Sequence, residues 1–138
     1  MELTQFKTVE QLAAAIKSLD MVTGVGWTDY SGTSTVTGWS SFTNKQIYYK
    51  RVGNLVFVKF RLAGTSDATN ANFTLPITAE GDYNGACWGR DDTGTRAATI
   101  FFVDGSVPDV DIYWGGSATG FTASGTKECN GMFWYEAA

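Results

Sequence analysis

The sequence predicts an all-β domain preceded by one short N-terminal helix, and three observations lead to this prediction. The chain of 138 residues contains 16 glycines, 14% aromatic residues and only two prolines, a composition that suits tight turns and pleated strands. After the first twenty or so residues, short strand-like segments recur roughly every eight to twelve residues with turn signals between them, which is typical of antiparallel sandwiches and barrels. A helical period of apolar residues occurs only near the N-terminus.

The N-terminal segment predicts a helix from about Val9 to Leu19. Thr8 followed by Gln11 forms a capping box, in which each side chain satisfies an unpaired amide of the first turn. The apolar residues recur at spacings of three and four and share one face of that helix: Val9, Leu12, Ile16 and Leu19. This stripe fits a helix that packs on the sheet of its own domain, and it also fits a short coiled-coil neck. Taken alone, Val or Ile at a with Leu at d favours dimers.

The boundary between the two parts falls near residues 20–24, so we expect a helix or neck over residues 1–21 and a β-domain over residues 22–138. The β-domain begins with a Gly-, Ser- and Thr-rich stretch, GVGWTDYSGTSTVTGWSSF. It predicts two short strands around a turn at Ser31–Ser34.

The segment QIYYKRVGNLVFVKFRLAG predicts the central hairpin, with Gly53-Asn54 as its two-residue turn. The expected partners across the hairpin are Val52 with Leu55, Arg51 with Val56, Tyr49 with Val58, and Ile47 with Phe60. One face then collects Ile47, Tyr49, Val56, Val58, Phe60 and Leu62. The other face carries Tyr48, Lys50, Lys59, Arg61, Leu55 and Phe57. This separation predicts a sheet with one buried face.

Further strands are expected later in the chain, at FTLP (Phe73–Pro76), TRAATIFFV (Thr95–Val103), DVDIYW (Asp109–Trp114) and the closing NGMFWYEAA. The turn between the second and third of these contains Asp104-Gly105 and Pro108. The segment YNGACWGRDDTG lies between the first and the second of these strands. It is rich in glycine and polar residues, and we interpret it as a loop region.

Charge and composition argue against several classes of function. The formal net charge is -4 and the pI is near 4.6, so the domain has no basic footprint for nucleic acid. The chain has no histidine, which is the usual proton shuttle and the commonest metal ligand. No apolar run of about 18 residues predicts a membrane span, and no leader with a charged and then an apolar region opens the chain. Cys87 and Cys129 fit either one disulfide or two buried thiols.

The acidic residues do not predict an enzyme or a metal site. The Asp-Thr-Gly triplet at residues 92–94 matches that of aspartic proteases, but Gly89, Arg90 and Asp91 precede it where an apolar strand is required. We interpret it as a surface turn. Asp104, Asp109 and Asp111 lack the remaining ligands of a calcium loop. The prediction is a non-catalytic protein without a cofactor or metal.

The tryptophans are the best candidates for binding residues, because exposed aromatic rings stack on sugars while a buried Trp fills a core. Trp88 is expected to be exposed in its glycine-rich stretch, with polar neighbours that would form hydrogen bonds to a sugar. The predicted ligand-binding set is Tyr83, Asn84, Trp88, Arg90 and Asp91. Lys50, Lys59 and Arg61 with Tyr48 resemble a stacking platform for single-stranded nucleic acid, but the acidic pI favours a solvated face instead.

Three segments resemble β-rich domains of bacteriophage fibre and receptor-binding proteins. They are the hairpin IYYKRVGNLVFVKFRLAGTS, the Leu-Pro strand end in FTLP, and the closing strand NGMFWYEAA. The resemblance covers about a third of the chain. It implies a jelly-roll-like antiparallel β-sandwich head that is homotrimeric, stands on a helical neck formed by Val9, Leu12, Ile16 and Leu19, and is displayed on the virion after assembly in the host cytoplasm.

The expected function is therefore adhesion to host-surface or environmental glycans by a phage fibre or receptor-binding head domain. Its expected partners are further copies of itself, other virion proteins and a cell-surface glycan, without nucleic acid or membrane insertion. An alternative is a purely architectural virion protein, such as a capsid decoration or a tail-assembly trimer, without a ligand. A glycan depolymerase or a protease is a third possibility, and it requires convergent carboxylates in a cleft.

Overall fold

The computed structural model describes residues 8–11, 26–92, 94–115 and 120–138. Residues 9–11 are helical, and the amide of Gln11 donates to the Thr8 hydroxyl at 3.1 Å. This bond is one half of the predicted capping box. Leu12, Ile16 and Leu19 lie outside the described residues, so the neck and the boundary near residue 21 remain predictions.

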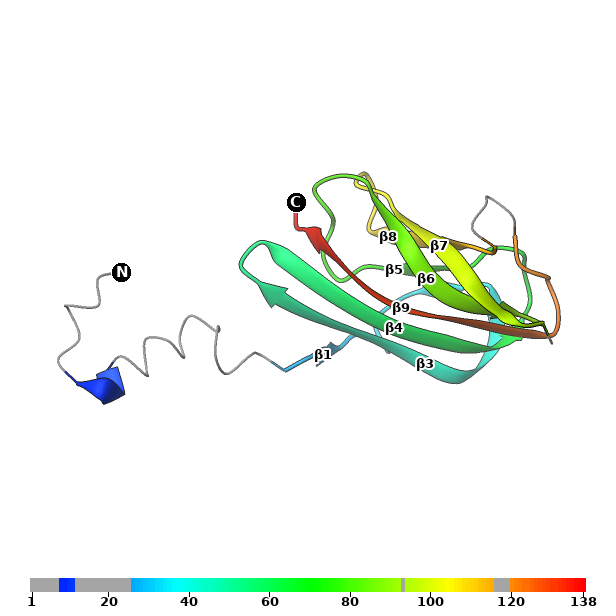
Figure 1. Cartoon of the computed structure of the whole chain (residues 1–138), viewed down its shortest axis with the longest axis horizontal. Helices are drawn as coiled ribbons and strands as arrows, with labels where there is room; N and C mark the ends of the chain where they lie inside the picture. Colours follow the sequence, from blue (N-terminus) through cyan, green and yellow to red (C-terminus); the bar gives the residue numbers. More distant parts are fainter. Residues whose placement is uncertain (1–7, 12–25, 93, 116–119) are drawn as a thin grey trace.

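The β-domain is one antiparallel sheet of nine described strands, which confirms the predicted all-β antiparallel fold (Figure 1). The strands are β1 (Thr28–Asp29), β2 (Val36–Thr37), β3 (Trp39–Val52), β4 (Leu55–Ser66), β5 (Asn72–Thr74), β6 (Tyr83–Asp91), β7 (Arg96–Val103), β8 (Asp109–Tyr113) and β9 (Thr126–Glu136). Their order across the sheet is β1-β3-β4-β9-β6-β7-β8-β5-β2. Among the described helical residues, no helix is long and apolar enough to cross a membrane.

The sheet curls into a sandwich-like shape, because the chain passes directly from one end of the strand order toward the other. Strand β2 pairs with β5, and after Gly38 the chain continues as β3 and pairs with β4. Gly38 has a φ of 104°, and a Cβ there would collide with the carbonyl oxygen of Asn70. Such bends allow one strand to switch between layers. Tyr30 ties the layers together, since its amide donates to Ile47 and its hydroxyl to the Leu75 carbonyl.

The central hairpin has the register that the sequence predicts. Val52 pairs with Leu55, Arg51 with Val56, Tyr49 with Val58, and Ile47 with Phe60. The predicted inner residues of β4 are buried, and Tyr49 packs against the core from a half-buried position. The core of the sandwich lies between the two layers and includes Ile47, Val56, Val58, Phe60, Leu62, Phe73, Phe101, Val103, Val110, Ile112, Phe133 and Tyr135.

The predicted turn at Ser31–Ser34 is present, and a short strand lies on each side of it. These strands do not pair with each other: β1 pairs with β3, and β2 pairs with β5. The strands expected near Phe73, Thr95 and Asp109 are confirmed as β5, β7 and β8, and the closing strand β9 begins at Thr126, four residues before the predicted Asn130.

The interpretation of YNGACWGRDDTG as a loop is wrong, because Tyr83–Asp91 forms strand β6 between β9 and β7. Its glycines make room for neighbouring groups instead of breaking the strand. A Cβ on Gly85 would lie 2.8 Å from the ring of Phe101, and a Cβ on Gly89 would lie 2.8 Å from the Thr99 hydroxyl. Only the end of the segment turns, where the amide of Gly94 donates to the Asp91 carbonyl.

Candidate functional site

Strand β6 divides the predicted ligand-binding residues between the two faces of the sheet, because successive side chains alternate. Asn84, Trp88 and Arg90 lie on the outer face, away from the core. Tyr83 and Asp91 lie on the opposite face, at the two ends of the strand. The structure therefore brings Trp88 and Arg90 together and separates Tyr83 and Asp91 from them.

Tyr83 and Asp91 already have protein partners. The Tyr83 hydroxyl donates to Glu80 and accepts the amide of Glu136, each at 3.2 Å. The Asp91 carboxylate accepts the amide of Thr122 at 2.9 Å and its hydroxyl at 2.8 Å. These contacts hold the chain segments beside β6, so the outer face of the strand offers the better binding surface.

Trp88 is exposed over 37% of its surface, which confirms the expectation for this side chain even though it stands in a strand. The guanidinium of Arg96 lies over its ring, with Cζ 4.6 Å from the centroid. Arg96 is the cross-strand partner of Arg90 on β7. Because a cation over an indole face is attracted to it, this contact orients the ring and places the donors of Arg96 beside it.

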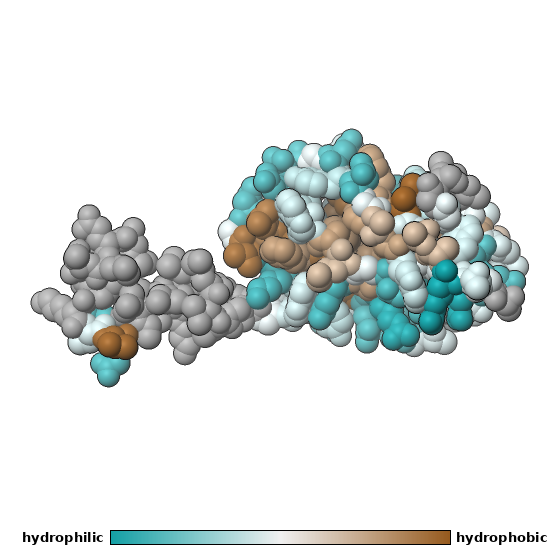
Figure 2. Space-filling model, in the orientation of Figure 1, coloured by the Kyte–Doolittle hydropathy of each residue, from teal (hydrophilic) through white to brown (hydrophobic). Residues whose placement is uncertain are grey.

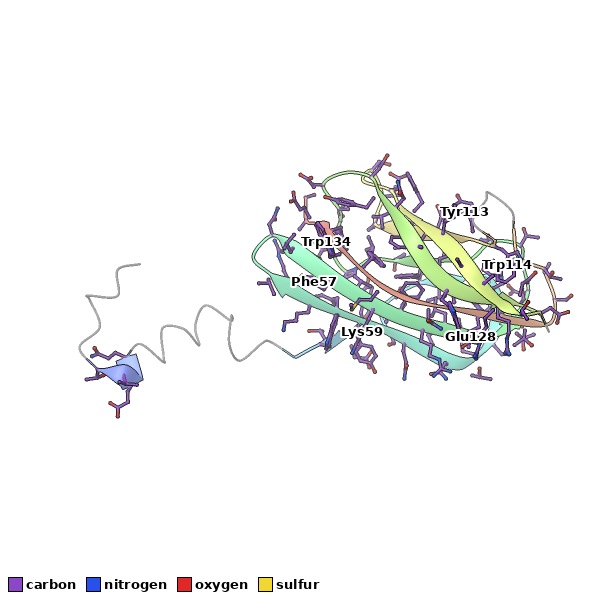
Figure 3. All side chains as sticks on the ribbon, viewed as in Figure 1. Phe57, Lys59, Tyr113, Trp114, Glu128 and Trp134 are labelled. Carbon is purple, nitrogen blue, oxygen red and sulfur yellow. The ribbon has the colours of Figure 1, made fainter. Side chains whose placement is uncertain are left out.

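Three arginines surround one acidic side chain on this face, and we call Arg61, Arg90, Arg96 and Glu128 the arginine cluster. Nitrogens of Arg61, Arg90 and Arg96 lie 3.7, 3.8 and 3.8 Å from the Glu128 carboxylate. Arg61 stands on β4, Glu128 on β9, Arg90 on β6 and Arg96 on β7, and these four strands are adjacent in that order. Glu128 stands on β9, toward the end opposite to Trp134 (Figure 3).

A shallow cleft of about 370 Å³ adjoins the cluster on the side of β3 and β4. It is lined by Gln46, Tyr48, Lys59, Phe60 and Arg61. The ammonium of Lys59 lies 4.5 Å from the ring centroid of Trp27 and 5.4 Å from that of Tyr48. Aromatic rings and cations therefore line the outer face on both sides of Arg61.

Of the three aspartates near the candidate calcium loop, Asp104 is engaged in a turn, whereas Asp109 and Asp111 stand on strand β8. Asp104 accepts the amide and the hydroxyl of Ser106 at 2.7 and 2.6 Å, and these hydrogen bonds lower the pKa of its carboxyl group. Burial raises the pKa of Asp111. Among the described residues, no group of three or more Cys, Asp and Glu side chains has the arrangement of a metal site.

Sequence reasoning missed Arg96, Glu128 and Trp134 as surface-determining residues. Trp134 is exposed over 55% of its surface and alternates with the buried Phe133 and Tyr135. That alternation is the signal that identifies it. Arg96 becomes predictable once β6 and β7 are recognised as a hairpin, because the register then places it opposite Arg90.

No protein-family model and no curated protein sequence matches this chain. One solved structure to which the chain has a weak similarity is the reovirus attachment protein sigma1, in complex with alpha-2,3-sialyllactose. The two are 11% identical, with a TM-score of 0.40 over 75% of this chain and 66% of the other. A similarity this weak is no basis for assigning a ligand or a function.

Proposed function

We propose that this chain is the head domain of a bacteriophage fibre or receptor-binding protein, which adheres to surface glycans as a homotrimer and catalyses no reaction. In this proposal the domain is assembled with other virion proteins in the host cytoplasm and displayed on the virion. The resemblance of the hairpin 46–64 and of the closing strand to such proteins supports the phage assignment. The glycan assignment rests on the outer face of the sheet.

The observation that carries the glycan assignment is the exposed Trp88 beside Arg90 and Arg96. Sugars present both apolar C–H faces and hydroxyl groups, so they bind where an aromatic ring adjoins hydrogen-bond donors. Trp88 supplies the ring and the guanidinium groups supply the donors. The neighbouring cleft is shallow and open, which suits a ligand that lies along the surface.

We expect Trp88→Ala to weaken binding to a glycan-array ligand by at least about tenfold, because truncating a central interface Trp commonly costs about 2 kcal/mol or more. The matched control is Phe42→Ala, which removes an equally exposed aromatic ring from strand β3, outside the proposed site. Array binding followed by titration measures both variants, and circular dichroism checks their folding. If Phe42→Ala abolishes binding and Trp88→Ala does not, the site is misplaced. If no glycan on a broad array binds, the adhesive function is wrong.

A second candidate function, a purely architectural virion protein, is favoured by the apolar part of the same face. Met132 and Trp134 are 66% and 55% exposed. A shallow hollow of about 560 Å³ is lined by Ile100, Phe102 and Tyr113 among others. Figure 2 shows apolar side chains across the middle of the visible face with hydrophilic ones above and below them. Apolar surface of this kind is usually covered by another protein.

Both functions include a homotrimer, so we expect sedimentation equilibrium to give three times the monomer mass of 14.9 kDa at micromolar concentration. Association buries apolar surface, which is the main favourable contribution to subunit contacts. We further expect Trp134→Ser to weaken the trimer and Lys50→Ser to leave it intact. A monomer at this concentration contradicts the trimer. A trimer without any glycan ligand favours the architectural function.

A further inference from the structure

The arginine cluster carries more positive charge than its own residues neutralise. Three guanidinium groups face the single carboxylate of Glu128, whose side chain is only 6% exposed. The side chains of Arg61 and Arg96 are each 52% exposed, and that of Arg90 is 36% exposed. The negative charge is therefore enclosed in the sheet surface, whereas the positive groups reach solvent.

Hydrogen-bond donors of the cluster are also left over. The distances of 3.7 to 3.8 Å to Glu128 are those of ion pairs, longer than direct hydrogen bonds. Each guanidinium carries five N–H donors. The Nε of Arg90 is buried and has no hydrogen-bond partner among the described residues. An unpaired buried donor is unfavourable, so the cluster lacks acceptors rather than donors.

Neighbouring acidic residues do not supply the missing acceptors. Asp91 follows Arg90 directly, but its side chain lies on the other face of β6 and its carboxylate accepts two hydrogen bonds from Thr122. On the side of the cluster toward Trp88, the flanking residues on the outer face are the neutral Gln46, Asn130 and Ala98, which lie in the same cross-strand row as Arg61 and Trp88.

Positive charge continues across the sheet and alternates with aromatic rings. Lys59 extends it from Arg61 toward Tyr48 and Trp27, and Trp88 lies under Arg96 at the other side. From β3 to β7 this surface crosses four inter-strand spacings, or about 19 Å. Because the whole chain carries a net charge of -4, this local concentration of cations is a property of this surface and not of the overall composition.

We propose that the ligand of this surface is an anionic saccharide, a sugar chain in which a carboxylate or sulfate group lies among Arg61, Arg90 and Arg96 while a neighbouring ring contacts Trp88. This inference rests on the proposed glycan-binding function and specifies its ligand class. Guanidinium groups recognise planar or tetrahedral oxyanions through paired N–H donors. The anion would supply acceptors to the N–H groups of the cluster that reach solvent.

The test compares ligands that differ only in charge. Oligogalacturonate and its methyl ester differ in the carboxylates, and dextran sulfate and dextran differ in the sulfates. We expect the intact chain to bind at least one charged member tenfold or more tighter than its neutral counterpart in calorimetric titrations. The pair with the larger difference in affinity shows whether the oxyanion that binds is a carboxylate or a sulfate. The affinity should fall as salt rises, because ion pairs on an exposed surface are screened.

Charge-removing variants locate the site. We expect Arg61→Gln and Arg96→Gln, whose side chains are half-exposed and therefore tolerant of change, each to weaken binding of the charged ligand about tenfold. Arg61→Lys should retain part of the affinity, because it keeps the charge and loses the paired donors. The control is Lys50→Gln, which removes the same charge from the outer face of β3 and should leave the affinity within about twofold.

Each remaining outcome decides against part of the proposal. Equal losses in Arg61→Gln and Lys50→Gln indicate diffuse attraction and overturn the site. If neutral and charged ligands bind equally well and Trp88→Ala weakens the binding of both, the anionic ligand class is refuted. The proposed glycan-binding function is then still supported. If no charged or neutral saccharide among these probes binds, and none on the array does, the proposed function itself fails.

Discussion

We expect Lys127→Met to lower the free energy of unfolding by about 3 kcal/mol, although its side chain lies on the core side of the sheet and not on the outer face proposed for binding. Lys127 is fully buried, and its ammonium donates to the carbonyl oxygens of Gly38, Ala68 and Asn70 at 2.8, 2.7 and 2.8 Å. It also lies 4.9 Å from the ring centroid of Trp39 and 5.1 Å from that of Phe121.

The magnitude follows from opposing contributions. Hydrogen bonds to a charged donor contribute about 1.5 to 3 kcal/mol each. One of the carbonyls keeps a neutral partner in the variant, since Gly38 also accepts the amide of Asp67. Methionine moreover avoids the cost of burying a charge, a cost that also lowers the pKa of Lys127. The net loss is therefore smaller than three full charged hydrogen bonds.

Urea denaturation measures this loss, and Lys50→Met is its matched control. Lys50 stands on the outer face of β3, so the same substitution there should change the free energy of unfolding by less than about 0.5 kcal/mol. If the free energy of unfolding of Lys127→Met lies within about 1 kcal/mol of that of the unchanged protein, the prediction is wrong. The hydrogen bonds of the ammonium would then stabilise the fold no more than its burial costs.

The second large effect is a loss of stability at alkaline pH that depends on the two free thiols, Cys87 and Cys129. Burial raises the pKa of Cys87 from 9.0 to about 12. Burial, followed by the charge of Cys87, raises the pKa of Cys129 well above 9.0. Because the folded state keeps these thiols protonated after the unfolded chain has released its protons, their contribution is fully present below pH 9 and is lost as the pH rises toward the folded pKa values.

We expect the free energy of unfolding to fall by about 1.4 kcal/mol per pH unit for Cys87 alone between pH 9 and 12. Urea denaturation under reducing conditions measures this from pH 7.5 upward. The double variant Cys87→Ala/Cys129→Ala is the comparison, and its stability should fall less steeply. The comparison removes the contribution of Tyr135, whose raised pKa acts equally in both proteins. Parallel slopes would contradict buried thiols at these positions.

Part of the candidate site was predictable because it depends on local pattern. The hairpin around Gly53-Asn54 has a strict alternation and a turn of defined length, which together determine its register. Arg61 and Lys59 were thereby placed on the outer face, where they are found. The exposure of Trp88 was predicted correctly for the wrong reason, since its glycine neighbours stand in a strand.

Glycine was the source of the main error, because its meaning depends on what lies opposite. Gly85 and Gly89 suggest a loop when only their neighbours in sequence are considered. In the folded chain they lie against Phe101 and Thr99, whose positions are determined by the β6–β7 pairing. A pattern confined to one segment contains no information about that pairing.

By itself the sequence determined most of the strands, the central hairpin and its buried face, because alternation and turn chemistry act over a few residues. Only the tertiary structure decided the order of the strands, the corner at Gly38 and the arginine cluster. Arg61, Arg90, Arg96 and Glu128 meet because β9 inserts between β4 and β6, bringing together residues from distant parts of the chain. Contacts of this kind follow from how the whole sheet closes around its core, so no local pattern specifies them.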